Sequence, residues 1–138
     1  MQRFTDLTVW RRSHSLVLEV YRLTRDFPQE EKFGLTSQIR RAALSIPTNI
    51  AEGSKRVARP DYARFLNIAE GSAAETQYLL MVSRDLGYLS RQTHDSAQRD
   101  LAEIARMLHG LRAKVEGKAD DAACDEMELH GAGFNFQL

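Results

Sequence analysis

The side chains that could carry acid–base or metal chemistry are scattered through this chain without the spacing that such chemistry needs. Di-iron sites in helical bundles use a glutamate three residues before a histidine. Arginine or methionine stands at that position before each histidine of the chain, namely His14, His94, His109 and His130. The sequence also lacks zinc-ligand spacing and a Walker-type phosphate loop. It therefore predicts no metal site, and His14 is expected to be a hydrogen-bonded interior histidine.

The candidate nucleophiles have no activating partner in the sequence. Cys124 is the only cysteine, and it stands among five acidic residues whose negative charge disfavours the thiolate. Ser45 and Ser72 have no histidine at a usable spacing. We therefore predict a protein without enzymatic activity, catalytic residues, cofactor or small-molecule substrate.

A group of cations forms a candidate nucleic-acid-binding surface. Net charge is zero, but residues 1–116 hold 18 Lys/Arg against 14 Asp/Glu, whereas residues 117–138 hold one against five. A basic cluster can neutralise phosphates and make binding strongly salt-dependent. A solvated surface with intramolecular ion pairs is the alternative interpretation, and the sequence leaves both open. The cluster consists of Arg40, Arg41, Lys55, Arg56, Arg59 and Arg64.

The first helix that would support these residues is predicted to run from a cap at Thr5 or Asp6 to about Phe27, where Pro28 stops it. It carries two apolar stripes, and together they cover more than half of its circumference. A helix that faces one core needs a stripe only a little over 100° wide. We therefore predict that the surplus stripe, which is Val9, Leu16, Val20, Leu23 and Phe27, contacts another subunit.

The second helix is predicted over about residues 35–55, with Pro47 inside it. An interior proline costs an ordinary helix roughly 3 kcal/mol, so this helix is expected to have a specific packing role. Its core stripe is Leu35, Ile39, Ala42, Ile46, Ile50 and Gly53. A polar flank of Gln38, Ser45, Asn49 and Glu52 is expected to bond to another helix or to offset the lost backbone bond.

Two further helices complete the expected fold. A third helix has Asp61 in its first turn and Gly87 at its end, and a fourth begins near Ser90–Ser96 and ends by Gly117. Four amphipathic helices with short connections predict an all-α, up-down-up-down four-helix bundle over residues 1–116. Residues 117–138 are predicted to be an acidic, glycine-containing tail. The single cysteine and the lack of a secretory or membrane-spanning segment predict a cytoplasmic protein without membrane contact.

Several short motifs occur together in one order along residues 4–115. They include Phe4-x-x-Leu7-x-x-Trp10, Gly34-Leu35-x-x-Gln38-Ile39-Arg40-Arg41-Ala42 and Asn49-Ile50-Ala51-Glu52-Gly53. This combination resembles the four-helix-bundle proteins encoded in intervening sequences of bacterial 23S ribosomal RNA genes. That family is similar to the accessory variability determinant of diversity-generating retroelements. The resemblance implies a homopentameric ring and, through the retroelement relatives, a basic surface that binds nucleic acid and a reverse transcriptase.

Two functions follow as hypotheses. The first is a non-enzymatic oligomeric scaffold that binds structured RNA or a nucleic-acid-handling protein. The second is a protein–protein adaptor that binds no nucleic acid. A third hypothesis concerns regulation: the acidic tail folds over the basic cluster and blocks it.

Overall fold

The computed structural model describes residues 3–117, and every regular element in this range is helical. Four α-helices follow one another with short connections between them. Two 3-10 turns, η1 (Phe4–Asp6) and η2 (Gln29–Glu31), precede the first and second α-helices. The α-helices are α1 (Thr8–Thr24), α2 (Leu35–Ser54), α3 (Arg59–Asp85) and α4 (Arg91–Val115).

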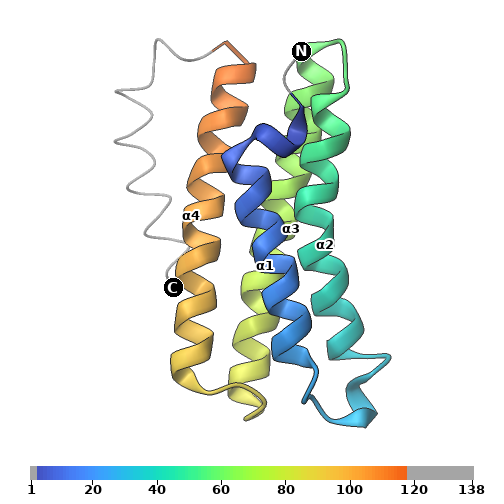
Figure 1. The fold of residues 1–138 in the computed structure, drawn as a ribbon, viewed down its shortest axis with the longest axis vertical. Coiled ribbons are helices and arrows are strands. Elements are labelled where there is room, and N and C mark those ends of the chain that lie inside the picture. Colours follow the sequence, from blue (N-terminus) through green and yellow to red (C-terminus); the bar gives the residue numbers. More distant parts are fainter. Residues whose placement is uncertain (1–2, 118–138) are drawn as a thin grey trace.

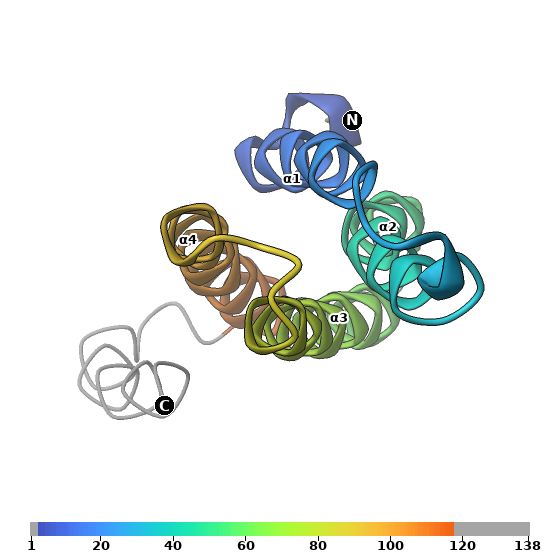
Figure 2. The ribbon, with the colours of Figure 1, turned by 90° about the horizontal axis from the view of Figure 1, so that it is seen from below.

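The helices form an up-down-up-down four-helix bundle, as the sequence predicts (Figure 1). Viewed along the bundle, they follow one another in order around the core, and α1 packs more extensively against α2 than against α4 (Figure 2). The α2–α3 connection and the end of α4 therefore lie at one end of the bundle. The α1–α2 and α3–α4 connections lie at the other end.

The predicted core stripe of α2 is confirmed, and the periodic apolar faces of α3 and α4 are buried except toward the cationic end, where Tyr62, Phe65, Leu111 and Val115 are partly exposed. In α2 the whole stripe from Leu35 to Gly53 is buried, and in α4 the seam through Ala97, Leu101, Ile104 and Leu108 is buried. Gly87 has φ +82° and ends α3, because the Tyr88 amide donates to the Ser83 carbonyl and closes the turn. Ser90 caps α4 by accepting a hydrogen bond from the Thr93 amide at 3.1 Å.

The expected shape of the first helix is wrong at both ends. Residues Phe4–Asp6 form a separate 3-10 turn, so Thr5 and Asp6 do not cap α1, and α1 ends at Thr24. The stripe predicted to contact another subunit lies in the core of this chain instead. Its members Val9, Leu16, Val20 and Phe27 are buried, and Leu23 packs against them.

The other apolar stripe of α1 is buried only at Val17, and its remaining members are half-buried or exposed: Leu7, Trp10, His14 and Tyr21. His14 is exposed, not interior, and its ring stacks on Trp10 with centroids 5.1 Å apart. Tyr21 is exposed as well. Small polar residues, Ser13 and Thr24, complete the buried face of α1, each bonded to the carbonyl four residues earlier. Apolar spacing alone therefore predicted the wrong buried face for α1, because serine and threonine can also be buried when their hydroxyls bond to the backbone of their own helix.

The polar flank of α2 divides into two pairs. Ser45 contacts Ser72 of α3 at 2.7 Å between the hydroxyl oxygens, and the Asn49 amide donates to both the Ser45 hydroxyl and the Ser45 carbonyl. The predicted bond to another helix is thus formed by Ser45. Gln38 and Glu52 are exposed and make no such bond within the described part of the chain. Pro47 is buried in the interior of α2.

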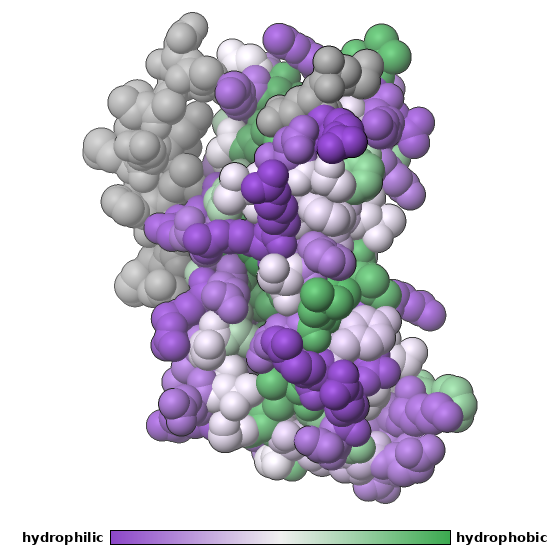
Figure 3. Space-filling view, viewed as in Figure 1, coloured by the Kyte–Doolittle hydropathy of each residue, from purple (hydrophilic) through white to green (hydrophobic). Residues whose placement is uncertain are grey.

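The hydrophobic side chains visible on one face of the molecule form separate islands among hydrophilic ones (Figure 3). Within residues 3–117, the helices are too polar to cross a membrane.

Candidate nucleic-acid interface

The basic residues that lie together are those around the α2–α3 connection. Helix α2 ends at Ser54, and the Arg56 amide donates to the Gly53 carbonyl, which closes a tight exit. Helix α3 begins at Arg59, with Pro60 in its first turn, where its missing N–H costs nothing. This short connection brings four cations to one end of the bundle. We call Lys55, Arg56, Arg59 and Arg64 the cationic end.

Gly53 sets the distance between the two helices that carry the cationic end. A Cβ at this position would lie 2.8 Å from the Phe65 Cβ and 3.0 Å from the Tyr62 Cδ1. Only glycine permits that approach without displacing a helix. The same close approach half-buries Tyr62, and burial raises the pKa of its phenol. The ring of Phe65 is thereby fixed beside the exit of α2.

Phe65 in turn supports two of the arginines. The guanidinium carbon of Arg56 lies 4.8 Å from the ring centroid, and that of Arg64 lies 5.0 Å from it. Both distances are within the range of favourable cation–π contacts, which contribute about 0.5–1 kcal/mol at exposed sites. The ring thus restricts the two long side chains, so less conformational entropy is lost when they meet a ligand.

An aromatic row continues from Lys55 along α1. The ammonium nitrogen of Lys55 lies 6.0 Å from the Phe4 ring centroid, and the Phe4 ring meets Trp10 edge-on at 5.2 Å. Trp10 then stacks on His14 with an interplanar angle of 7°. Phe4 and Trp10 are half-buried and His14 is exposed. Exposed aromatic faces beside cations are the groups on which unpaired bases stack.

The other two predicted members of the basic cluster lie elsewhere. Arg41 is exposed on α2 fourteen residues before Lys55, about 20 Å away along the helix at 1.5 Å per residue. Arg40 donates from Nε to the Thr24 hydroxyl at 2.8 Å and from Nη2 to the Tyr21 carbonyl at 3.4 Å, and it stacks on the Tyr21 ring. It therefore fastens α2 to the last turn of α1. A contiguous sequence span does not imply one surface on a helix this long.

The cationic end differs from the ion pairs nearby. Among residues 3–117, no carboxylate lies within ion-pair distance of its four cations. Arg112 of α4, by contrast, pairs with Glu70 of α3 and with Glu116. The hydrogen bond to Glu70 is the main cause that raises the pKa of Arg112. Ion pairs within the chain thus hold Arg112, which is not one of the six predicted cations, whereas the four cations of the cationic end are exposed to solvent. A solvated surface and a nucleic-acid-binding surface both fit this exposure.

Sequence reasoning missed the aromatic side chains of this surface. Helical spacing with Leu7, Val17 and Tyr21 predicts a core stripe for Trp10 and His14, and spacing with Ala69 and Ala73 predicts a buried face for Phe65. The exposure of Trp10 and His14 depends on how α1 is rotated and on where η1 ends. The spacing of residues along the chain reports neither. The motif Phe4-x-x-Leu7-x-x-Trp10 was the available signal, since it places two aromatic residues at the start of a helix.

The histidines of the described residues lie apart from one another. No group of three His, Cys, Asp or Glu side chains is placed to hold a metal ion there. His94 is buried beside Asp95 and Gln98, and His109 lies 3.5 Å from Glu70. Cys124 and His130 lie outside the described residues.

These observations define an all-α bundle protein with a cationic, aromatic-lined end. Residues 5–110 match the model of a family described as 23S rRNA-intervening sequence protein, and the chain belongs to this family. It is similar to the crystal structure of a protein of unknown function from the S23 ribosomal protein family of Bacteroides thetaiotaomicron. That match has 28% sequence identity and a TM-score of 0.69, and it covers 76% of this chain and 98% of that chain. No curated protein matches the chain.

Proposed function

We propose that this protein is a non-enzymatic scaffold that binds structured RNA through the cationic end. The observation that carries the proposal is the arrangement of Arg56 and Arg64 on the Phe65 ring, with no carboxylate partner in the described chain. Guanidinium groups bind phosphate through parallel N–H donors, so held and unpaired arginines suit a nucleic-acid backbone. An RNA partner would place the protein in the cytoplasm.

The form of RNA is suggested by the neighbouring aromatic row. Proteins recognise RNA sequence mainly in loops, bulges and ends, where bases are unstacked and can lie on aromatic rings. Lys55 joins the cationic end to Phe4, so a backbone bound at the cations passes close to the row. A hairpin, with a duplex stem and an unpaired loop, supplies both kinds of contact.

We also propose that the scaffold is a homopentamer, as the family resemblance implies. The support within the chain is a pair of exposed apolar residues on the outer side of α2 and α3, Leu44 and Ile68, which are 41% and 42% exposed. They flank the Ser45–Ser72 contact, so a partner there would meet two adjacent helices. Light scattering coupled to size exclusion measures the subunit number. A monomeric mass would contradict the assembly while leaving the cationic end in place.

The experiment that tests RNA binding compares two triple variants of equal charge. Replacement of Lys55, Arg56 and Arg59 by glutamate removes three candidate phosphate contacts, whereas the control replaces the exposed cations Arg25, Lys32 and Arg91 at the other end. Affinity for an RNA hairpin is measured by fluorescence anisotropy between 50 and 200 mM salt. We expect the first variant to lose binding and the control to retain it. For the unmodified protein, three phosphate contacts predict a log–log salt slope of about 2–3 in magnitude.

Equal loss of affinity in both triple variants would show that binding is a general charge effect. Binding that does not change with salt, or no binding at 50 mM salt, would contradict the proposal directly.

A protein–protein adaptor is the second candidate function, and a different surface favours it. Phe33 is 89% exposed and Leu86 is 54% exposed, and both lie in the connections at the end opposite the cationic end. Acidic residues Asp26, Glu30 and Asp85 stand beside them in the sequence. A partner that binds after nuclease treatment, and is lost when Phe33 and Leu86 become serine, would support the adaptor.

A further inference from the structure

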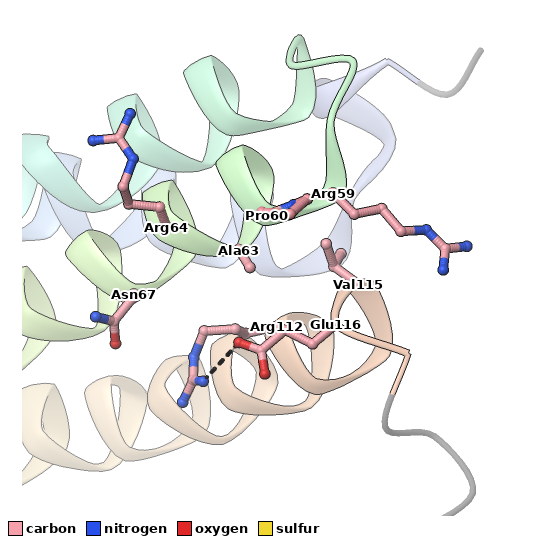
Figure 4. A pocket seen from close by; sticks show the side chains of 8 residues that line it. All are labelled: Arg59, Pro60, Ala63, Arg64, Asn67, Arg112, Val115 and Glu116. Carbon is pink, nitrogen blue, oxygen red and sulfur yellow. Dashed lines mark hydrogen bonds and ion pairs between the residues drawn. The ribbon is translucent and has the colours of Figure 1, made fainter.

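The chain leaves the bundle directly beside the cationic end. Helix α4 ends at Val115, and Gly117 adopts the left-handed conformation, with φ +79°. The Arg59 guanidinium lies next to this glycine, since its Nη1 would be 3.9 Å from a Cβ at position 117. The last turn of α4 and the first turn of α3 thus lie side by side: Val115 points toward α3, Glu116 turns toward Arg112, and the Arg59 guanidinium points outward (Figure 4).

An open cavity separates these two turns. Its volume is about 490 Å3, and its lining carries three guanidinium groups against one carboxylate. Arg112 pairs with Glu70 and Glu116, which leaves Arg59 and Arg64 as the lining cations without a carboxylate partner in the described chain, although the Arg64 guanidinium points away from α4 (Figure 4). The lining also includes the apolar residues Pro60, Ala63 and Val115. A segment that enters here meets apolar surface beside the Arg59 cation.

The sequence that follows Gly117 has the opposite charge. Five acids occur within nine residues, at Asp120, Asp121, Asp125, Glu126 and Glu128. The family match ends at residue 110, so this acidic segment is an addition to the shared fold. Because a residue spans at most about 3.4 Å, Asp120 lies within about 10 Å of Gly117, and Glu128 within about 40 Å. The segment can therefore reach every cation from Arg59 to Lys55.

We propose that residues 118–128 bind the cationic end of their own chain and compete there with RNA. The proposal rests on the proposed function, because it assigns a regulator to the same four cations. A short tether gives the segment an effective concentration on the order of millimolar at a site beside its anchor. RNA must displace it, so the acidic segment sets a threshold that weak or short RNA ligands do not pass.

The occupancy of the cationic end is tested without RNA by paramagnetic relaxation. Cys124 is the only cysteine, and a nitroxide attached to it reports where this segment lies. We expect the label to broaden amide signals of residues 55–65 at low salt. High salt, or replacement of the five acids by Asn and Gln, should remove this broadening. Broadening at residues 25–33 instead, or none at either end, would overturn the proposal.

Mixing spin-labelled protein with separate 15N-labelled protein distinguishes the chain's own segment from that of a neighbour. Broadening as strong in the mixed sample as in protein that carries both labels would show contact between subunits and contradict binding within one chain. The measurement contains no RNA. A negative result would therefore count against binding of the acidic segment and would leave the proposed RNA binding untouched.

The functional consequence is measured by RNA-hairpin affinity at 50 mM salt. For a segment with an intrinsic dissociation constant of about 0.1–0.5 mM, truncation after Gly117 should raise RNA affinity roughly 3- to 10-fold. Neutralising the five acids should have the same effect. A control with the same change in net charge converts five acids of the bundle to amides, and it should raise affinity less: Asp26, Glu30, Glu75, Asp85 and Asp100. Equal affinities in the truncated and full-length proteins would contradict competition.

Discussion

The two ends of this bundle are built from the same helices but held together differently. At the end with two connections, the Tyr88 hydroxyl donates to Glu31 at 3.0 Å, and the Tyr88 ring packs on Phe27. Both contacts join residues far apart in the sequence and stabilise the α1–α2 and α3–α4 connections together. At the cationic end, Lys55, Arg56 and Arg64 contact aromatic rings, and none of the four cations pairs with a carboxylate of residues 3–117.

The charge of Glu31 is thus used within the fold, whereas the charges of the cationic end are not paired within the described chain. The Glu31 carboxylate contributes to the fold, because it accepts hydrogen bonds from the Tyr88 phenol and the Leu35 amide. A guanidinium on a ring keeps its N–H donors directed at solvent, because the ring accepts none of them in its plane. Binding at the cationic end therefore breaks no ion pair between the described residues. Four predictions test this contrast, and their expected effects decrease in size.

Leu108→Ala should destabilise both ends together. Leu108 is fully buried in α4, and truncation of such a leucine costs about 2–5 kcal/mol through lost contacts and a residual cavity. The free energy of unfolding is measured by urea denaturation. Leu18→Ala serves as the control, because Leu18 is 52% exposed and should change stability far less. Comparable losses in the two variants would show that the core is assigned wrongly.

Gly53→Ala should act mainly on the cationic end. The new methyl group would approach Phe65 and Tyr62 too closely, and such overpacking costs about 1–3 kcal/mol. Gly71→Ala is the matched control on α3, since nothing lies within 4 Å of its added Cβ. Alanine there should stabilise the helix by about 0.5–1 kcal/mol. Thermal denaturation of both variants shows whether each substitution raises or lowers stability. A stabilised Gly53→Ala protein would contradict the close approach of α2 and α3 at Gly53.

Phe65→Leu should separate the position of the arginines from their charge. The substitution removes two cation–π contacts of about 0.5–1 kcal/mol each while leaving net charge unchanged. We expect RNA-hairpin affinity to fall although every cation remains. Tyr78→Leu, at an exposed position on the same helix, should leave affinity unchanged. Full affinity in Phe65→Leu would mean that the charge alone is sufficient.

Tyr88→Phe should alter the pH dependence of stability at the opposite end. The hydrogen bond to Glu31, and secondarily burial, raises the pKa of the Tyr88 phenol above its ordinary value of 10.0. The folded state thus favours the neutral phenol, and this stabilisation is fully present below pH 10. It is lost as pH rises through the raised pKa of the folded protein.

The free energy of unfolding of wild type and of Tyr88→Phe is measured from pH 8 to 11, and the difference between the two proteins gives the contribution of the phenol. The gap in stability between wild type and Tyr88→Phe should narrow at the alkaline end. A constant gap would indicate that the phenol does not titrate differently in the folded state. RNA affinity should not change, because Tyr88 lies at the other end of the bundle.

The sequence by itself determined the class of fold and most of the core. Periodic apolar residues in α2, α3 and α4 identified the buried faces, because a helix that faces one core must place its apolar residues three or four apart. Local chemistry set several boundaries, with Ser90 at the start of α4 and Gly87 after α3. These features depend on residues close together in the chain, and a pattern in the sequence reports them directly.

Only the tertiary structure decided which stripe of α1 is buried and which cations share a surface. Both stripes of α1 have helical spacing, and the choice between them depends on the rotation of α1 against α2, where Arg40 bonds to the last turn of α1. The distance along α2 separates Arg41 from Lys55, while the α2–α3 connection and the Phe65 ring bring Arg56 and Arg64 together. Such long-range packing has no period in the sequence, because it arises from contacts between helices.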